Sequence, residues 1–220
     1  RGDEGISFQS LFSLADSLIC FEVLPVQHNR YIVTGLHKHN RFTILDGNGN
    51  KVGDFGGYPY RDEEEKKVDG FVLGDVYQGK LAASPRRNRF VQAIYKARIL
   101  TFYEQSGEHW NLVKEIQESF PKYKYNSPAI ETDTPIGYLD VCATEKYVYA
   151  LYSGKNYRDD KEAAFSGYTI EVYGWDGTLQ KRYLSDVPLK AIEVSKDDGS
   201  LYAIAYHPDP VLVQFTLFGQ

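Results

Sequence analysis

The sequence has no methionine and only two cysteines among its 220 residues. It also lacks any run of about 18 apolar residues, so no transmembrane helix is expected, and no charged-then-apolar leader opens the chain. An excess of positive charge is missing as well, because 25 basic residues stand against 30 acidic ones and the net charge is −5. That balance gives no general attraction for nucleic acid or anionic lipid. We therefore expect neither a nucleic-acid partner nor a transmembrane segment.

The signatures of several catalytic classes are absent too. There is no Gly-x-Ser-x-Gly elbow, phosphate loop, His-Glu-x-x-His or Cys-x-x-Cys motif, which disfavours hydrolase, nucleotide and zinc chemistry. His37 and His39 could serve a metal, but spacing assigns no third ligand. Residues 46–50 resemble the start of a calcium loop, yet Lys51 occupies the glycine position, which favours a hairpin turn. No cofactor is predicted.

The two cysteines, Cys20 and Cys142, both lie in apolar, strand-like stretches. Such positions are typical of buried free thiols rather than of a disulfide. Hydrophobic residues make up 42% of the chain and aromatic residues 15%, which suffices for a substantial core and excludes intrinsic disorder. We expect one domain, and a monomer.

A strand start recurs four times along the chain, at Tyr31, Phe90, Tyr147 and Ser200. The steps between these residues are 59, 57 and 53 residues, and a fixed period of this kind indicates a propeller or a solenoid. Around each landmark the sequence predicts a strand before it, one or two strands after it, and short turns rich in Gly, Asn and Asp between them. That order is the order of a propeller blade.

The predicted fold class is therefore an all-β propeller, with four recognisable blades of antiparallel four-stranded sheets in a single domain over residues 1–220. The predicted blades span residues 18–56, 77–118, 138–184 and 189–220. The third is expected to end in a strand at 178–184 and the fourth to begin with a separate strand at 189–195. The fourth blade has only three predicted strands, and an outer strand could come from the other terminus. Residues 1–17 fit either that closing strand or a short helix.

The connections between strands fall into two groups. Turns between the first and second strands, and between the third and fourth, share one face of a propeller, and all of them are short. The opposite face receives the long connections, 56–75, 119–137 and 154–167, of which we interpret the first two as solvated loops. Long loops gathered on one rim are typical of a functional surface. We predict that this rim binds a partner.

Tyrosine and arginine carry contact energy well at interfaces, although tyrosine is also a common strand residue. The candidate binding residues on the rim are Tyr58, Tyr60, Arg61, Tyr123, Tyr125, Tyr157 and Arg158, with Tyr95, Arg98 and His207 nearer the channel. His207 beside Asp209 could also form an acid and base pair, but a rigid turn capped by aspartate is the favoured interpretation.

Residues 41–59 and 83–90 resemble the TolB-like six-bladed β-propellers, and the resemblance extends over roughly residues 18–218. The resemblance implies an exported or envelope-anchored bacterial protein, in the periplasm or on the cell surface, and it brings no shared catalytic motif. Six blades of about 55 residues would need about 330, so we expect two further blades upstream rather than a smaller ring.

The function predicted from these observations is a non-catalytic binding scaffold of the cell envelope. It would engage a peptide, a glycan or an envelope protein partner through the long-loop face. The alternative is an enzyme of the lactonase or lyase kind with a metal in the central channel. The two differ in an observable way, because an enzyme needs channel-facing His, Asp or Glu side chains that converge on one point.

Overall fold

The computed structural model describes residues 19–206 and 208–217. Its fourteen strands are β1 (Ile19–Val26), β2 (Arg30–Leu36), β3 (Phe42–Leu45), β4 (Lys51–Phe55), β5 (Gly79–Ala83), β6 (Arg89–Ile94), β7 (Ile99–Ser106), β8 (His109–Gln117), β9 (Tyr138–Ala143), β10 (Tyr147–Tyr152), β11 (Gly167–Gly174), β12 (Leu179–Val194), β13 (Ser200–Tyr206) and β14 (Pro210–Thr216). Two α-helices, α1 (Gly70–Val76) and α2 (Tyr157–Asp160), and two 3₁₀ turns, η1 (Glu65–Lys67) and η2 (Lys161–Phe165), complete it. The segment predicted as a helix or closing strand, residues 1–17, lies outside the described residues, as does His207.

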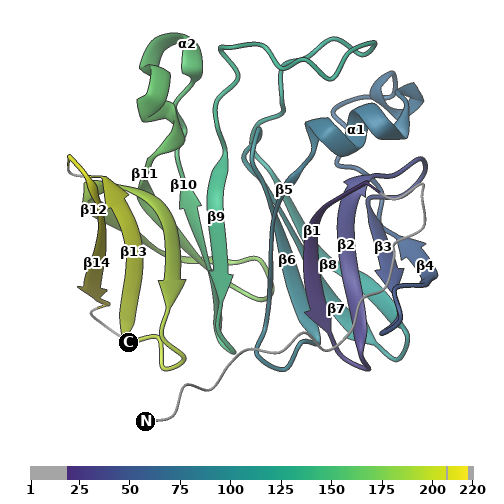
Figure 1. Cartoon of the computed structure of the whole chain (residues 1–220), viewed down its shortest axis with the longest axis horizontal. Coiled ribbons are helices and arrows are strands. Elements are labelled where there is room, and N and C mark those ends of the chain that lie inside the picture. The colour runs from purple at the N-terminus through teal and green to yellow at the C-terminus, as the bar shows by residue number, and fades with distance from the viewer. Residues whose placement is uncertain (1–18, 207, 218–220) are drawn as a thin grey trace, which may run out of the picture.

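The strands form antiparallel meanders. One sheet has the order β1-β2-β3-β4, a second has the order β5-β6-β7-β8, and the third has the order β14-β13-β12-β11-β10-β9. Figure 1 shows these sheets following one another along an arc, with their strands running roughly parallel to a common axis. Contacts join β1 to β5, β5 to β9, and β9 to β12. The innermost strands of successive blades therefore lie side by side around that axis, and the predicted propeller is confirmed.

One boundary differs from the prediction. The strands expected at 178–184 and 189–195 are a single strand, β12, which pairs with β11 through its first half and with β13 through its second. The sequence between the halves holds no glycine or asparagine that would favour a tight turn. The Ser185 hydroxyl instead bonds to the carbonyl of Val187, 2.7 Å away, and the chain stays extended. The outer strand of the third blade thus continues directly as the inner strand of the fourth.

The core is divided into layers between neighbouring blades. Phe42 from the first blade and Phe90 and Tyr103 from the second are buried against one another in the first layer. Phe90 and Tyr103 stack with ring centroids 4.9 Å apart, and Phe42 meets Phe90 edge to face at 5.3 Å. Separate buried clusters fill the second and third layers. Each layer takes side chains from two blades, so the blades stabilise one another by burial of apolar surface.

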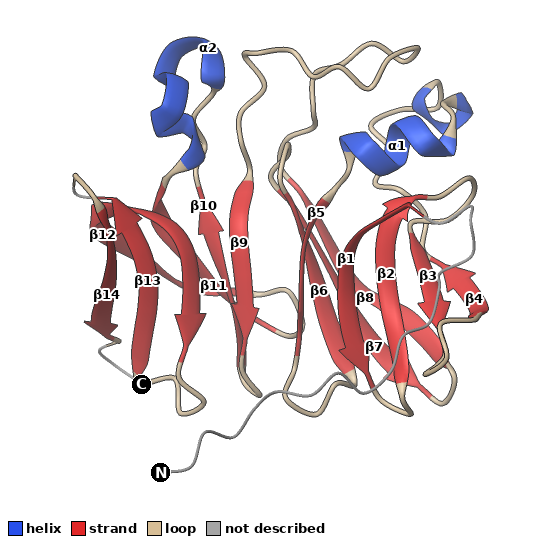
Figure 2. Ribbon diagram, in the orientation of Figure 1, coloured by secondary structure: helices blue, strands red, loops and turns tan. Residues whose placement is uncertain are grey.

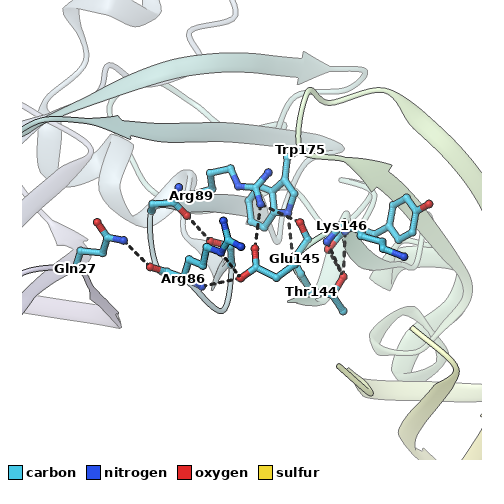
Figure 3. A network of polar contacts seen from close by, with 10 residues as sticks. Gln27, Arg86, Arg89, Thr144, Glu145, Lys146 and Trp175 are labelled. Carbon is cyan, nitrogen blue, oxygen red and sulfur yellow. Dashed lines mark hydrogen bonds and ion pairs between the residues drawn. The ribbon is translucent and has the colours of Figure 1, made fainter. Parts of the chain in front are cut away.

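Short turns of successive blades are also tied together by polar contacts, shown in Figure 3. The amide of Gln27 donates to the carbonyl of Arg86, 2.8 Å away, and the backbone N–H of Arg86 donates to the Glu145 carboxylate at 3.1 Å. Arg89 donates to the carbonyl of Glu145 at 2.9 Å, and its guanidinium lies 4.8 Å from the ring centroid of Trp175. Partners in these hydrogen bonds are 59, 59 and 56 residues apart. Hydrogen bonds between the short turns of neighbouring blades thus recur at about the length of one blade.

Both cysteines are free thiols, as predicted. Cys142 is buried in the layer between the third and fourth blades, and Cys20 is partly buried on β1. Burial raises the pKa of both thiols. A raised pKa keeps a thiol protonated and lowers its nucleophilicity, and Cys142 packs in the buried cluster of its layer.

Candidate functional site

The three long connections emerge on one face of the molecule. In Figures 1 and 2, helix α1, helix α2 and the loop of residues 119–137 all stand at the top, while the turns between first and second strands lie at the bottom. The predicted asymmetry of loop length is therefore present in the structure. We call the surface formed by residues 56–76, 119–137 and 153–166 the long-loop rim.

The prediction of a solvated loop was wrong for residues 56–75, which include helix α1, whereas residues 119–137 form a loop without helix or named strand that buries Tyr123. Helix α1 begins after Asp69, whose carboxylate accepts from the N–H of Phe71 at 2.8 Å, and it buries Leu73 and Val76. These side chains share a cluster with Tyr58, Tyr77, Ile94, Ala97, Ile99 and Tyr123. The rim thus has a small core of its own, because the apolar positions of α1 fall on one helical face.

The carboxylate of Glu65 is buried beside this small core, and Glu65 as a whole residue is 0% exposed. It accepts hydrogen bonds from the hydroxyls of Tyr77, at 2.8 Å, and Tyr123, at 2.7 Å. Burial, together with the negative charge of Glu65, raises the pKa of both hydroxyls, so they remain protonated donors. Glu65 lies in the charged run of residues 62–67, inside the segment that was predicted to be a solvated loop. Only the long-range contact with Tyr123 reveals its role, and spacing along the sequence carries no signal of it.

Replacing Tyr123 with phenylalanine should lower the free energy of unfolding by about 1.5–3 kcal/mol, since a buried charged acceptor loses one of its donors. Urea unfolding measures the change. Tyr125→Phe is the matched control, because the Tyr125 hydroxyl bonds at the surface to Asp62, 2.6 Å away, and its loss should cost less than about 1 kcal/mol. Equal effects of the two substitutions would show that Glu65 is not held as described.

Arg61 joins two of the long connections on the outside of the same cluster. Its guanidinium donates to the Tyr125 hydroxyl at 2.6 Å and lies 5.1 Å from the centroid of that ring. Of the predicted residues in this area, Tyr58 and Tyr123 are each only 6% exposed, so they support the rim from beneath. Tyr60, Arg61 and Tyr125 keep part of their surface accessible. They form an aromatic and cationic patch of the kind that suits partner binding.

Tyr157 and Arg158 lie at the start of helix α2, which is capped by the Asn156 side chain. Tyr157 is 42% exposed. The Arg158 guanidinium lies 3.2 Å from the carboxylate of Asp133, which also pairs with Lys122 at 3.1 Å. Asp133 thereby links the insert of the third blade to the connection before it. Tyr157 and Arg158 remain candidate contact residues, with side chains that a partner can reach.

Of the residues predicted nearer the channel, Tyr95 lines a cavity. This cavity has a volume of about 240 Å³ and lies against Phe21, Glu22 and Lys80 of the innermost strands. Burial raises the pKa of the Tyr95 hydroxyl. Arg98 instead points between the second and third blades, where it contacts Glu171 and lies 4.6 Å from the ring centroid of Tyr152. The interpretation of Arg98 as a channel residue is therefore corrected.

The two motifs that resembled metal sites have other roles. Asp46 closes a hairpin, accepting from the backbone N–H groups of Asn48 at 2.8 Å and Asn50 at 2.9 Å. His37 is buried, while His39, beyond the end of β2, is exposed, so the two imidazoles do not share one surface. Within residues 19–206 and 208–217, no group of three or more His, Cys, Asp or Glu side chains is placed to hold a metal ion.

Sequence analysis missed a larger cavity at the opposite end of the axis. Its volume is about 460 Å³, and its walls come from the ends of β1, β5, β9 and β12 together with the turns that follow β5 and β12. Short turns gave no reason to expect a site there. The one signal in the sequence is a basic residue in two of those turns, Arg87 and Lys196.

Comparison of the fold with solved structures finds similar chains, among them a β-propeller domain. A hydrazine synthase of Kuenenia stuttgartiensis matches 96% of this chain with a TM-score of 0.56 and 14% identity. The β-propeller domain of Cps50 (Swd1) from Myceliophteria thermophila matches 87% of it with a TM-score of 0.52 and 10% identity. In each case this chain spans 49% of the other, about half its length. Identities this low show the fold alone.

Comparison by sequence gives one family and no individual relative. No curated protein matches the chain. No helix among the described residues is long and apolar enough to cross a membrane. The model of the TolB-like 6-blade propeller-like family matches residues 9–197, a span that includes β1 to β12 and all three long connections. The chain therefore belongs to the TolB-like 6-blade propeller-like family.

Proposed function

We propose that this protein is a non-catalytic binding scaffold of the bacterial cell envelope, and that it engages a peptide, a glycan or a partner protein through the long-loop rim. The observation that carries the proposal is the gathering of three long connections, from different blades, on one face. Propellers place inserts of distant sequence side by side in this way. Membership of the TolB-like family supports an exported location, in the periplasm or on the cell surface.

The physical character of the rim fits recognition rather than catalysis. Its inserts are tied to one another by Tyr123 with Glu65, by Arg61 with Tyr125, and by Arg158 with Asp133. Loops fixed in this way lose little conformational entropy when a partner binds, which favours affinity. The exposed tyrosine and arginine side chains between these ties supply contact area and hydrogen-bond donors. For the alternative, an enzyme with a metal in the channel, residues 19–206 and 208–217 offer no group of three or more His, Cys, Asp or Glu side chains placed to hold the ion.

The test is a screen of the purified protein on peptide and glycan arrays, repeated with Tyr157→Ala and Arg158→Ala combined. We expect the double variant to bind the captured ligand at least about tenfold more weakly, because two accessible contact residues are lost together. Its unfolding midpoint should change little, because both side chains are exposed: Tyr157 by 42% and the Arg158 side chain by 57%.

The matched control removes an arginine and an aromatic ring from the other end of the blades, by Arg30→Ala combined with His109→Ala. Arg30 pairs there with Glu108 at 3.1 Å, and His109 is exposed. Binding by this control should equal that of the unaltered protein. Unchanged binding by the Tyr157 and Arg158 variant, or an equal loss in the control, would remove the long-loop rim as the binding face.

A further inference from the structure

The cavity of about 460 Å³ lies where the innermost strands end at the short-turn face. Its volume falls within the range typical of small-ligand sites. Much of its wall is apolar, formed by Leu24, Ala83, Ala143 and Val194, one residue from the innermost strand of each blade. A ligand here would touch all four blades at once. None of these residues belongs to the long-loop rim.

Three charged residues also line this axial cavity, together with Pro25, Ser84, Pro85 and Thr144. Arg87 comes from the turn after β5, Lys196 from the turn after β12, and Glu193 from β12 itself. Two cations against one carboxylate leave the cavity with a positive balance, although the whole chain has a net charge of −5. Burial raises the pKa of Glu193, and the nearby carboxylate of Asp140 raises it further. The local charge therefore favours an anionic group, in contrast to the molecule as a whole.

The turn that carries Arg87 is held from both sides. Arg86, the preceding residue, accepts a hydrogen bond from Gln27 of the first blade and donates one to Glu145 of the third, as Figure 3 shows. Arg87 itself has φ +58°, a left-handed conformation that is unfavourable for a residue other than glycine. The N–H of Arg87 closes the turn by donating to the carbonyl of Ser84, 2.7 Å away. The structure thus fixes the backbone from which Arg87 enters the cavity.

The turn that carries Lys196 is anchored in a similar way. The N–H of Ser195 donates to the carbonyl of Ser200 at 2.9 Å, and the N–H of Asp198 donates to the carbonyl of Ser195 at 2.9 Å. The Asp198 carboxylate accepts from the hydroxyl of Tyr149 in the third blade, 2.9 Å away. Both cations are therefore presented by short, tightly bonded turns that need little ordering when a ligand binds.

We propose that this axial cavity is a second binding site, which takes an apolar peptide segment that carries a carboxylate. The carboxylate pairs with Arg87 and Lys196, since arginine in particular forms paired hydrogen bonds with carboxylates. The apolar side chains beside it pack against Leu24, Ala83 and Val194. The carboxylate comes either from the free end of the peptide or from an aspartate side chain within it.

Three fluorescently labelled peptides test the site by fluorescence anisotropy. The first is a short Leu, Val and Pro peptide with a free carboxyl end, the second is amidated and contains one internal Asp, and the third is amidated and has no acid. We expect saturable binding of the first or the second, which identifies the source of the carboxylate, and no binding of the third. If none of the three binds at millimolar concentration, or if all three bind equally, the proposal is wrong.

Variants then separate the cavity from general electrostatics. Arg87→Gly removes the cation and places glycine where φ is positive, so the fold should not be weakened. We expect Arg87→Gly to lower the affinity for the peptide about tenfold and Lys196→Gln to lower it about fivefold. Glu193→Gln should raise the affinity about threefold, since it removes a charge of the same sign as the carboxylate of the peptide.

Lys146→Gln is the matched control, because this exposed lysine lies on the same face and does not line the cavity. It carries the same change in net charge as Lys196→Gln and should leave the affinity unchanged. Equal losses in Lys146→Gln and Lys196→Gln, or full affinity in Arg87→Gly, would overturn the site.

Discussion

Replacing Glu171 with alanine should lower the free energy of unfolding by about 3–5 kcal/mol, because several donors are left around an empty position in the layer between the second and third blades. The Glu171 side chain is 1% exposed. It accepts from Arg98 across the layer, from Arg182 at 2.9 Å, and from the hydroxyls of Tyr138 at 2.9 Å and Tyr173 at 2.8 Å. Loss of the Glu171 carboxylate removes these four hydrogen bonds and leaves the guanidinium groups of Arg98 and Arg182 without this acceptor.

The dependence of this contribution on pH follows from the pKa of Glu171. Burial alone pushes that pKa upward, but the hydrogen bonds from Tyr173, Arg182 and Tyr138 and the charge of Arg98 outweigh burial and leave the pKa lowered. A lowered folded-state pKa stabilises the fold above the unfolded value of about 4.3, and this stability is lost as the pH falls through the folded value. The difference between the unaltered protein and Glu171→Gln should therefore be constant near pH 7 and shrink below about pH 4.

Urea unfolding at pH 7 and again at acidic pH measures both effects. Glu118→Ala is the matched control, because Glu118 pairs with the same arginine at 2.7 Å but has a side chain that is 43% exposed. Its loss should cost less than about 1 kcal/mol. If Glu118→Ala were as damaging as Glu171→Ala, the buried carboxylate would not be what holds these two blades together.

Replacing Phe90 with alanine should cost about 3–5 kcal/mol, because it opens a cavity in the layer between the first and second blades. Phe90 has 0% exposure and meets four aromatic rings: Tyr103 at 4.9 Å, Trp110 at 5.0 Å, Phe42 at 5.3 Å and Phe55 at 6.2 Å. Aromatic pairs of this geometry contribute beyond the area that they bury. Tryptophan fluorescence, from Trp110 beside Phe90 and from Trp175 in the next layer, follows the unfolding.

The matched control for this second prediction is Phe71→Ala, in the first turn of helix α1. Phe71 is 46% exposed, so the same change of side chain should cost less than about 1 kcal/mol. Urea unfolding measures both losses. The slope of the unfolding free energy against urea concentration should be the same in each variant, since a changed slope would indicate altered compactness. A loss at Phe90 no greater than that at Phe71 would mean that the blades do not share this layer.

Much of the blade architecture could be predicted from local sequence. The recurring strand start at Tyr31, Phe90, Tyr147 and Ser200 falls at the second strand of each blade, and glycine turns such as residues 46–50 mark the hairpins. These signals act over a few residues, where strand alternation and turn chemistry decide the structure. The placement of long connections on one face followed from the same meander rule.

Contacts between distant residues could not be predicted in this way. Glu65 accepts a hydrogen bond from Tyr123, which is 58 residues away in the sequence. Arg98 lies between two blades rather than in the channel, where it donates to Glu171, 73 residues away. Neither contact could be predicted from the residues around Glu65 or Glu171, because local composition carries no information about a partner in the next blade. The axial cavity was missed for the same reason, since its walls come from four separate strand ends.

The central claim is that the long connections of different blades share one rim, and cross-linking between lysines tests it most directly. Asp133 bridges Lys122 and Arg158, and Lys161 donates to the Arg158 carbonyl at 2.8 Å. With a short amine-reactive cross-linker and mass spectrometry, Lys122 should link to Lys161, and Lys66 or Lys67 should link to Lys124. Lys146 and Lys196, at the short turns, should link to none of these. Links from Lys161 to Lys146 or Lys196, without one to Lys122, would contradict the account.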